Sequence, residues 1–225
     1  EFGFQSYPSM EAIRRFADPR GFNIAAPVME SHQKNAGGNA RIAETMFRYF
    51  RFPVGFGNFV YLSQVQQGLA IKTAVTHWRS LKPHCMGTLY WQLNDTWPVC
   101  SWSGLDHGGN WKLLHHMARE FYAPLLVTAV PGSDGITLRA VNDTAAPVML
   151  EIDAYAIAMS GAIRNGSSTV ATSLASYGIR LSSGSANCIP RWPSVRPATM
   201  RLSTPSRNCS SSCMILCSSS ISSSR

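Results

Sequence analysis

The spacing of hydrophobic positions changes along the chain from helical to strand-like. Before Pro124, apolar side chains recur three or four positions apart in several runs, and each run predicts a helix. The predicted helices lie after the N-cap residue Ser9, after Asn39, from Phe59 to Ser80, and from Asn110 to before Pro124. In the helix over 59–80, one stripe is expected to hold Leu62, Val65, Leu69, Lys72 and Thr76, with Gln64, Gln66 and Gln67 mostly off it.

Two segments among these helices have the pattern of strands. Residues 1–5 resemble the end of a buried strand, and residues 86–93 form a near-continuous apolar and aromatic run. Such a run is typical of a strand that is buried on both faces. Asn94, Asp95 and Pro98 then supply turn residues that end it. Because helices separate the two strands, we expect them to pair in parallel through helical crossovers.

From Leu125 the hydrophobic period shortens to two residues. Strands are predicted over 125–130, 136–141 and 148–157, with turn residues between them. This pattern predicts the start of a β-sandwich, in which three strands are too few to close two sheets.

After about Ser160 the composition changes sharply, because serine, arginine and cysteine dominate and periodicity is lost. One hypothesis is a disordered linker or basic tail. The other is translation in the wrong reading frame after a nucleotide deletion near the codons for 158–164. Arginine without lysine and a sandwich that stops mid-sheet favour the second hypothesis. Resequencing that recovers the same open frame would contradict it.

The net charge of +8 comes from this last part of the chain. All 12 acidic residues lie at or before Asp153, and 13 of the 20 basic residues precede it, so that part carries 13 − 12 = +1. The other seven basic residues are arginines of the tail. We therefore expect no nucleic-acid-binding face on the folded part.

Residues for metal, cofactor or membrane binding are not apparent in the sequence. The 6 cysteines and 6 histidines show no zinc or redox spacing, and Cys85 and Cys100 are expected to be small buried residues. There is no phosphate-binding glycine loop and no apolar run long enough for a membrane span. We expect no cofactor, no metal and no membrane association. The segment 142–144 matches a glycosylation sequon, which is a weak signal by itself.

Several motifs together resemble one enzyme family. The segments EFGFQSYPS, YWQLNDTWP, SWSGLD and GNWKLLHHMAREFYAPL resemble the β-mannosidases of glycoside hydrolase family two, in order and in spacing. The resemblance covers residues 1–153. It implies that residues 1–123 are the last two strand–helix units of a (β/α)8 TIM barrel and that residues 124–158 begin an immunoglobulin-like β-sandwich. Residues 159–225 would be a low-complexity tail, and we expect the chain to be a fragment.

The same resemblance implies a mechanism and its residues. Glu1 would be the nucleophile of a retaining exo-β-mannosidase, and Trp91 would be the aromatic platform under the sugar, with no cofactor. Retaining enzymes need a second carboxylate as acid/base. In the family it is a Glu preceded by Asn, and no glutamate here follows an Asn. We therefore expect the chain alone to be inactive. Asn94 and Asp95 either contact sugar or cap the loop, whereas packing is expected for Trp97, Trp102 and Trp111.

Other functions stay open at this point. Within the enzyme class, the alternatives are a sister family-two activity, exo-β-glucosaminidase or β-galactosidase. Outside it, the chain could be a non-catalytic truncated or pseudogene product, or a carbohydrate-binding remnant. A nucleic-acid binder would rest on the tail arginines alone, without interleaved aromatic residues. The expected partner is a carbohydrate, specifically a β-mannoside.

Overall fold

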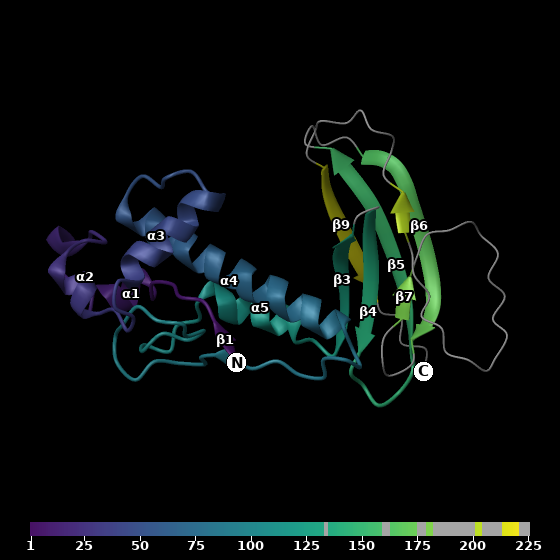
Figure 1. The fold of residues 1–225 in the computed structure, drawn as a ribbon, viewed down its shortest axis with the longest axis horizontal. Coiled ribbons are helices and arrows are strands. Elements are labelled where there is room, and N and C mark those ends of the chain that lie inside the picture. Colours follow the sequence, from purple (N-terminus) through teal and green to yellow (C-terminus); the bar gives the residue numbers. More distant parts are fainter. Residues whose placement is uncertain (133–134, 159–162, 175–178, 182–200, 204–212, 221–225) are drawn as a thin grey trace. The chain divides into compact units, whose positions relative to one another are not determined.

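The chain combines helices and strands in two units (Figure 1). The computed structural model describes residues 1–132, 135–158, 163–174, 179–181, 201–203 and 213–220. The first unit consists of Glu1–Trp78 and Gly87–Tyr122, and the second of Arg79–Met86 and Ala123–Arg225.

The first unit is mainly helical. Its short helical segments are α1 (Met10–Ile13), the 3-10 helix η1 (Pro19–Gly21) and α2 (Pro27–Ser31). Its longer helices are α3 (Gly38–Tyr49), α4 (Phe56–Ser80, whose last two residues belong to the second unit) and α5 (Leu113–Phe121). Its two strands are β1 (Phe2–Gly3) and β2 (Tyr90–Trp91).

The two strands of the first unit pair in parallel, as predicted. Phe2 lies opposite Tyr90, and Gly3 lies opposite Trp91. The prediction of a long strand buried on both faces is wrong, because β2 has only two residues and Leu89 is 76% exposed. The physical reason is that α4 and α5 cover only one face of the pair. Phe2 and Tyr90 pack there against a buried cluster of Ile71, Val75, Leu114, Ala118 and Phe121.

Local hydrogen bonds decide where the helices begin. Ser9 caps α1 as predicted, because its Oγ accepts from the backbone N–H of Ala12 at 3.1 Å. Asn39 does not cap α3, which starts after Gly37 in the left-handed conformation with φ 69°. The α5 helix starts at Leu113 rather than at Asn110, whose amide instead binds Asp106.

The buried face of α4 differs from the predicted stripe. Leu69, expected inside, is 45% exposed, whereas Gln67 has no exposed area. Its Nε2 donates to the carbonyls of Phe4 at 2.9 Å and Trp102 at 3.1 Å, and its Oε1 accepts from the Ser6 hydroxyl at 2.7 Å. The prediction failed because buried carbonyls outside a regular ladder need donors, which a glutamine provides and a leucine does not.

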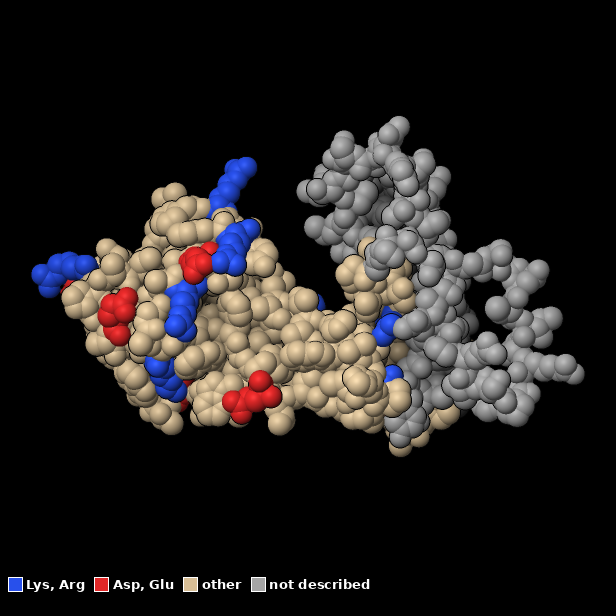
Figure 2. Space-filling model, viewed as in Figure 1, with Lys and Arg blue, Asp and Glu red and all other residues tan. Residues whose placement is uncertain are grey.

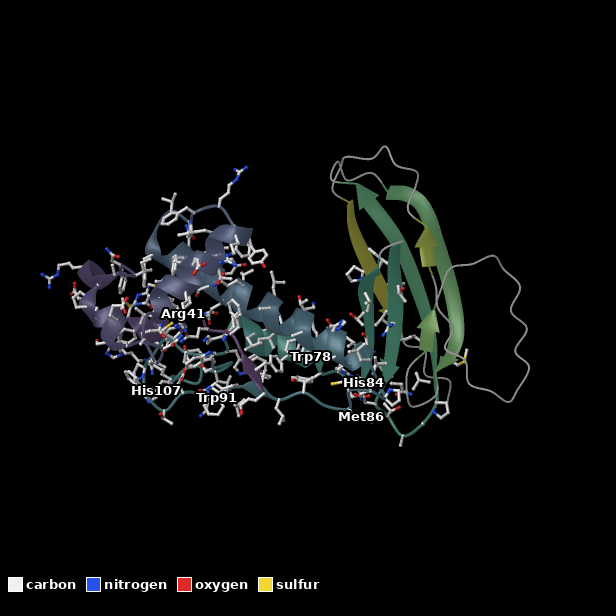
Figure 3. All side chains as sticks on the ribbon, in the orientation of Figure 1. Arg41, Trp78, His84, Met86, Trp91 and His107 are labelled. Carbon is white, nitrogen blue, oxygen red and sulfur yellow. The ribbon has the colours of Figure 1, made fainter. Side chains whose placement is uncertain are left out.

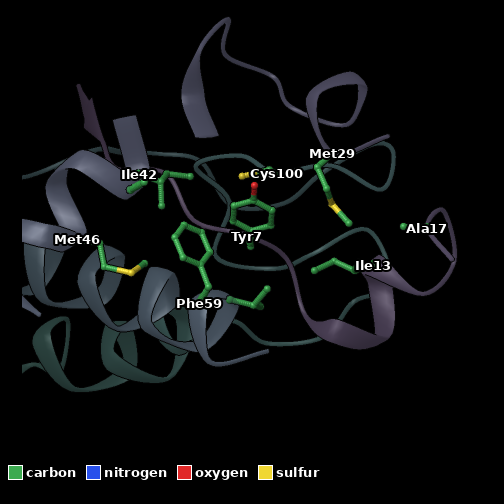
Figure 4. Close-up of a cluster of buried hydrophobic side chains, with 10 residues drawn as sticks. Tyr7, Ile13, Ala17, Met29, Ile42, Met46, Phe59 and Cys100 are labelled. Carbon is green, nitrogen blue, oxygen red and sulfur yellow. The ribbon is translucent and has the colours of Figure 1, made fainter. Parts of the chain in front are cut away.

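A second hydrophobic cluster of the first unit surrounds Tyr7 (Figure 4). It joins the segment after β1 to the helices α1, α2, α3 and α4. Its buried members include Ile13, Met29, Ile42, Met46, Phe59 and Cys100. The expectation of a small buried cysteine holds for Cys100, at 1% exposure, whereas Cys85 is only partly buried.

The second unit contains two antiparallel sheets. The three predicted strands are present as β3 (Leu125–Gly132), β4 (Gly135–Asn142) and β5 (Val148–Ala158). Four further strands follow: β6 (Ile163–Leu174), β7 (Ile179–Leu181), β8 (Arg201–Ser203) and β9 (Cys213–Ser220). One sheet has the order β3-β4-β7 with β8 also on β4, and the other has the order β6-β5-β9.

The strands after Ile157 were not predicted from the sequence. Backbone groups alone can pair two strands. β6 and β9 pair with β5 although their sequences lack the hydrophobic alternation from which strands are predicted. The rest of the predicted tail, 159–162, 175–178, 182–200, 204–212 and 221–225, lies outside the described residues. The frameshift hypothesis stays a prediction.

The start of the second unit is held to the end of β4 by charged groups. Arg79 donates to the carbonyl of Ala123 at 2.8 Å and pairs with Asp143 at 2.9 Å. Lys82 also pairs with Asp143, and Arg139 donates to the carbonyl of Ser80 at 2.8 Å. These bonds tie residues 79–82 to the strands of the second unit.

The sequon at 142–144 is folded into a turn. Asn142 has no exposed area, its Nδ2 donates to the carbonyl of Ala146, and its Oδ1 accepts from the N–H and hydroxyl of Thr144. The nitrogen that would carry a glycan is therefore buried and bonded. Among the described residues, no helix has the length and hydropathy to cross a membrane.

Candidate active site

The two residues singled out by the sequence lie at the β1–β2 pair, Trp91 in β2 and Glu1 directly before β1. Trp91, labelled in Figure 3, is opposite Gly3 across the pair, and Glu1 precedes Gly3 by two residues. Side chains alternate between faces along a strand, so an extended backbone at Glu1 would put its side chain on the face of Gly3 and Trp91. Glu1 is exposed, and Trp91 is 49% exposed. The offset of two residues corresponds to roughly 7 Å along the strand.

Because Gly3 has no side chain, the Trp91 carbonyl and the Trp102 ring can lie close to its backbone. A Cβ at Gly3 would meet the carbonyl oxygen of Trp91 at 2.8 Å and Cδ1 of Trp102 at 2.9 Å. The half-buried Trp102 indole therefore packs directly on the strand. This contact is the packing role that the sequence suggested for Trp102.

Asp95 fixes the loop that follows Trp91. Its side chain has no exposed area. Lys34 Nζ donates to its Oδ1 at 2.9 Å, and the hydroxyls of Ser101 and Ser103 donate to its Oδ2 at 2.6 and 2.5 Å. Of the two roles open for Asp95, these bonds support loop fixation. Asn94, by contrast, is exposed.

Lys112 is a buried cation under the same loop, and sequence reasoning missed it. It is 1% exposed, and its Nζ donates to the carbonyls of Ser6 at 3.3 Å and Ser101 at 3.4 Å. Burial lowers the pKa of Lys112 to about 8, although the neighbouring Asp95 opposes that shift. The only sequence signal was a lysine directly before the apolar run of a helix.

Two other titratable groups near the loop are structural. Burial raises the pKa of the Cys100 thiol to about 12, so this thiol is neutral and is no nucleophile. Burial alone would raise the pKa of the Asp106 carboxyl, but hydrogen bonds from Ser9 and Asn110 outweigh it and leave that pKa below its usual value. Asp106 thereby joins the start of α1 to the segment before α5.

The other two tryptophans for which packing was expected, Trp97 and Trp111, contact histidines. Trp97 is 37% exposed and lies with its ring centre 5.3 Å from that of His32. Trp111 is 49% exposed and packs edge-on against His115 at 4.5 Å. In the described part of the chain, no three His, Cys, Asp or Glu side chains gather as metal ligands.

The other acidic groups of the first unit have partners on their own helices or nearby. Glu11 pairs with Arg15 and Glu44 with Arg48, each one helical turn away, and Glu120 pairs with Lys72. Figure 2 shows acidic and basic side chains interspersed on the visible face of this unit. The site thus offers one exposed carboxylate beside an indole, on a base of buried polar bonds.

Comparison with known proteins shows which proteins the chain is similar to. No protein-family model matches the chain. A β-mannosidase of Capra hircus is 33% identical over 156 residues, which is 64% of this chain and 18% of that protein. A β-mannosidase of Mus musculus is 37% identical over 139 residues, 56% of this chain and 16% of that protein. The chain therefore spans less than a fifth of the length of these relatives.

Solved structures give the same result. The crystal structure of a β-D-mannosidase from Dictyoglomus thermophilum has a TM-score of 0.76 at 32% identity, covering 80% of this chain and 22% of that chain. An exo-chitosanase from Amycolatopsis orientalis has a TM-score of 0.66 at 17% identity, covering 78% and 22%, and shows likeness of fold alone. In sequence and in fold, the chain thus matches a segment of the β-mannosidases, and by this resemblance it is related to the glycoside hydrolases.

Proposed function

We propose that the chain is a segment of a retaining exo-β-mannosidase, which removes terminal β-D-mannose from the non-reducing end of β-mannosides. The observation that carries the proposal is that Glu1 and Trp91 are both exposed at one pair of parallel strands, Glu1 directly before β1 and Trp91 in β2. The likeness to a much longer β-mannosidase, of which the aligned stretch is 18%, supports it.

In this proposal, residues 1–123 supply the last two strand–helix units of a (β/α)8 barrel. The parallel β1–β2 pair, with α4 and α5 on one face, fits such a unit. The exposed apolar residues Leu89, Trp91 and Leu93 fit the inner side and rim of a barrel that further strands would complete. The antiparallel sheets after residue 124 fit the start of an immunoglobulin-like sandwich, here assigned to 124–158.

The chemistry would proceed by double displacement. The Glu1 carboxylate would attack the anomeric carbon and form a glycosyl ester, while a carboxylic acid elsewhere in the longer enzyme protonates the departing oxygen. That second group would then deprotonate a water, which hydrolyses the ester and releases mannose with retained configuration. Trp91 would stack on the apolar face of the sugar. No step requires a cofactor.

The test is to extend the chain upstream from the same locus and to assay the longer polypeptide with p-nitrophenyl β-D-mannoside. We expect turnover, and we expect Glu1→Gln to lower kcat by at least about 10³-fold because the nucleophile is lost. The matched control is Glu11→Gln, which removes an exposed glutamate paired with Arg15 and should leave kcat unchanged. Full activity in the Glu1→Gln enzyme would refute the role of Glu1.

A second candidate is exo-β-glucosaminidase activity. It is the second candidate because an exo-β-D-glucosaminidase shares the fold at 17% identity. The two enzyme activities differ in the substituent and its orientation at the sugar C2. A panel of p-nitrophenyl β-mannoside, β-glucosaminide and β-galactoside on the extended polypeptide separates them, and the mannoside is expected to have the highest kcat/KM.

A further inference from the structure

Three consecutive residues after α2, Gln33, Lys34 and Asn35, bond to the chain segments that follow both β1 and β2. We call them the 33–35 bracket. On the β1 side the partner is Gln5, two residues after Gly3 and 7% exposed. Its Nε2 donates to Gln33 Oε1 at 2.7 Å, and its Oε1 accepts from Asn35 Nδ2 at 3.0 Å. The bracket thus engages both ends of the Gln5 amide.

On the β2 side the partner is Asp95, four residues after Trp91. Lys34 Nζ contacts Asp95 Oδ1 at 2.9 Å, and the Lys34 N–H donates to the carbonyl of Cys100 at 3.1 Å. The side chain of Lys34 is 23% exposed and that of Asp95 is fully buried. The ion pair is therefore shielded from solvent far more than a surface pair.

The bracket is itself anchored in the helices through a directional chain of amides. Gln33 Nε2 donates to Asn39 Oδ1 at 2.8 Å, and Asn39 Nδ2 donates to Glu30 Oε1 at 3.0 Å. With Asn35 and Gln5, each amide accepts from the previous group and donates to the next, and the chain ends on a carboxylate. Such aligned hydrogen bonds polarise and strengthen one another.

Gly38 lies close to this chain of amides. A Cβ at Gly38 would lie 2.6 Å from Gln33 Cδ and 2.8 Å from Gln5 Oε1. At the start of α3, Gly38 therefore lies directly against the side-chain amides of Gln33 and Gln5.

The β1–β2 ladder is too short to define its own geometry, since each strand has two residues. We propose that the 33–35 bracket positions Glu1 and Trp91 relative to each other, with Lys34 as the decisive positioning residue. This inference rests on the proposed function, because it concerns the same two residues. Lys34 itself acts through Asp95 and the loop after Trp91.

The test is ¹⁹F NMR of the full chain labelled with 5-fluorotryptophan, with the Trp91 resonance assigned by Trp91→Phe. Lys34→Met is expected to shift or split the Trp91 resonance, while Trp78, which packs on Phe2 at 4.5 Å, keeps its shift. Lys34→Arg is expected to restore the Trp91 resonance. Lys72→Met is the matched control, because it removes a lysine from an exposed pair with Glu120 outside the bracket.

A second variant covers the case that Lys34→Met does not fold. Asn35→Ala cuts one bond to Gln5 and leaves the Lys34–Asp95 pair intact, and it should shift Trp91 in the same way. An unchanged Trp91 resonance in folded Lys34→Met or in Asn35→Ala, with only a lower melting temperature, would overturn the inference. The readout needs no turnover, so a shifted Trp91 in a chain whose extended form lacks glycosidase activity would support the bracket and refute the proposed function.

Discussion

Single residues in this chain are constrained mainly by polar contacts and close approaches. Asp95 is buried within the loop after β2, and Lys112 is buried beneath that loop. Gly3 lies where the Trp91 carbonyl and the Trp102 ring leave no space for a side chain. Each of them is an unusual residue for its location, since buried charges and strand glycines both cost stability. Their locations coincide with the edge that carries Glu1 and Trp91.

Lys112 makes stability depend on pH. Its pKa is about 8 in the folded chain and about 10.5 when unfolded, so between these values the unfolded state binds more protons and stability rises with pH. From pH 7.5 to 9 this contribution should increase the free energy of unfolding by about 1 kcal/mol. Urea unfolding of wild type and Lys112→Met at both values measures it, and the increase should be absent from the variant.

The window of pH 7.5 to 9 matters because, above it, the titration of Cys100 changes the free energy of unfolding in the opposite direction. Its thiol has a pKa of about 12 when folded, so its contribution to stability is lost as pH rises from about 9 to 12. An equal pH dependence in wild type and Lys112→Met below pH 9 would show that Lys112 does not titrate as described.

Gly3→Ala should destabilise the first unit. The added methyl group would overlap the carbonyl of Trp91 and the Trp102 ring, and overpacking of this kind costs about 1–3 kcal/mol. Gly57→Ala, at a helical glycine with open space around its Cβ, should instead be neutral or stabilising. Thermal melts of both variants test the pair, and equal melting temperatures would contradict the close contact.

At the scale of elements, α4 is ordered around polar side chains rather than an apolar stripe. Ser63, Gln66 and Gln67 face inward alongside Phe59, Ile71 and Val75. Gln66 Nε2 donates to the carbonyl of Ile42, and Gln67 binds carbonyls on both sides of the β1–β2 edge. The helix thus joins α3, β1 and the loop after β2 by hydrogen bonds.

Because of this arrangement, replacing a glutamine of α4 by alanine should cost more stability than replacing a leucine, which reverses the usual order. Gln67→Ala leaves three buried carbonyls without this donor and should cost about 1–3 kcal/mol or more. Leu69→Ala, on the exposed side of the same helix, should change stability by less than about 0.5 kcal/mol. Chemical unfolding of the two variants measures both changes in the free energy of unfolding. A larger decrease for Leu69→Ala would mean that α4 buries the face that carries Leu69.

At the scale of the whole molecule, the chain matches one segment, 18%, of a much longer β-mannosidase. A retaining glycosidase needs two carboxylates, and the proposal assigns only one of them, Glu1, to this chain. General acid catalysis contributes about 10²–10⁴-fold. In the proposed function, a longer enzyme would also supply the remaining walls of the sugar site.

We therefore expect the 225-residue chain alone to release no p-nitrophenol from the aryl β-mannoside. The measurement compares the chain with its Glu1→Gln variant at high protein concentration over hours. Turnover that disappears in Glu1→Gln would show that the chain holds a complete catalytic pair. Turnover that persists would point to a contaminating enzyme.

Sequence patterns predicted much of the secondary structure, because helical and strand periods are local properties. The Ser9 cap, the long helix near 59–80, the parallel pairing of the two short strands and the three strands from Leu125 were all recognisable. So was the resemblance to β-mannosidases, since long motifs in register carry specific information. The assignments of Glu1 and Trp91 follow from that resemblance and stay predictions.

Tertiary contacts determine which residues are buried and which polar groups pair, and no local sequence pattern contains this information. Whether Gln67 or Leu69 faces inward depends on carbonyls of distant segments that need a donor. Asp95 and Lys34 are separated by 61 positions in sequence, and the sequence alone left the role of Asp95 open. Burial of Lys112 likewise follows from the folding of the loop around it. A chain's periodicity sets its elements, whereas partners for buried polar groups exist only once the elements have come together.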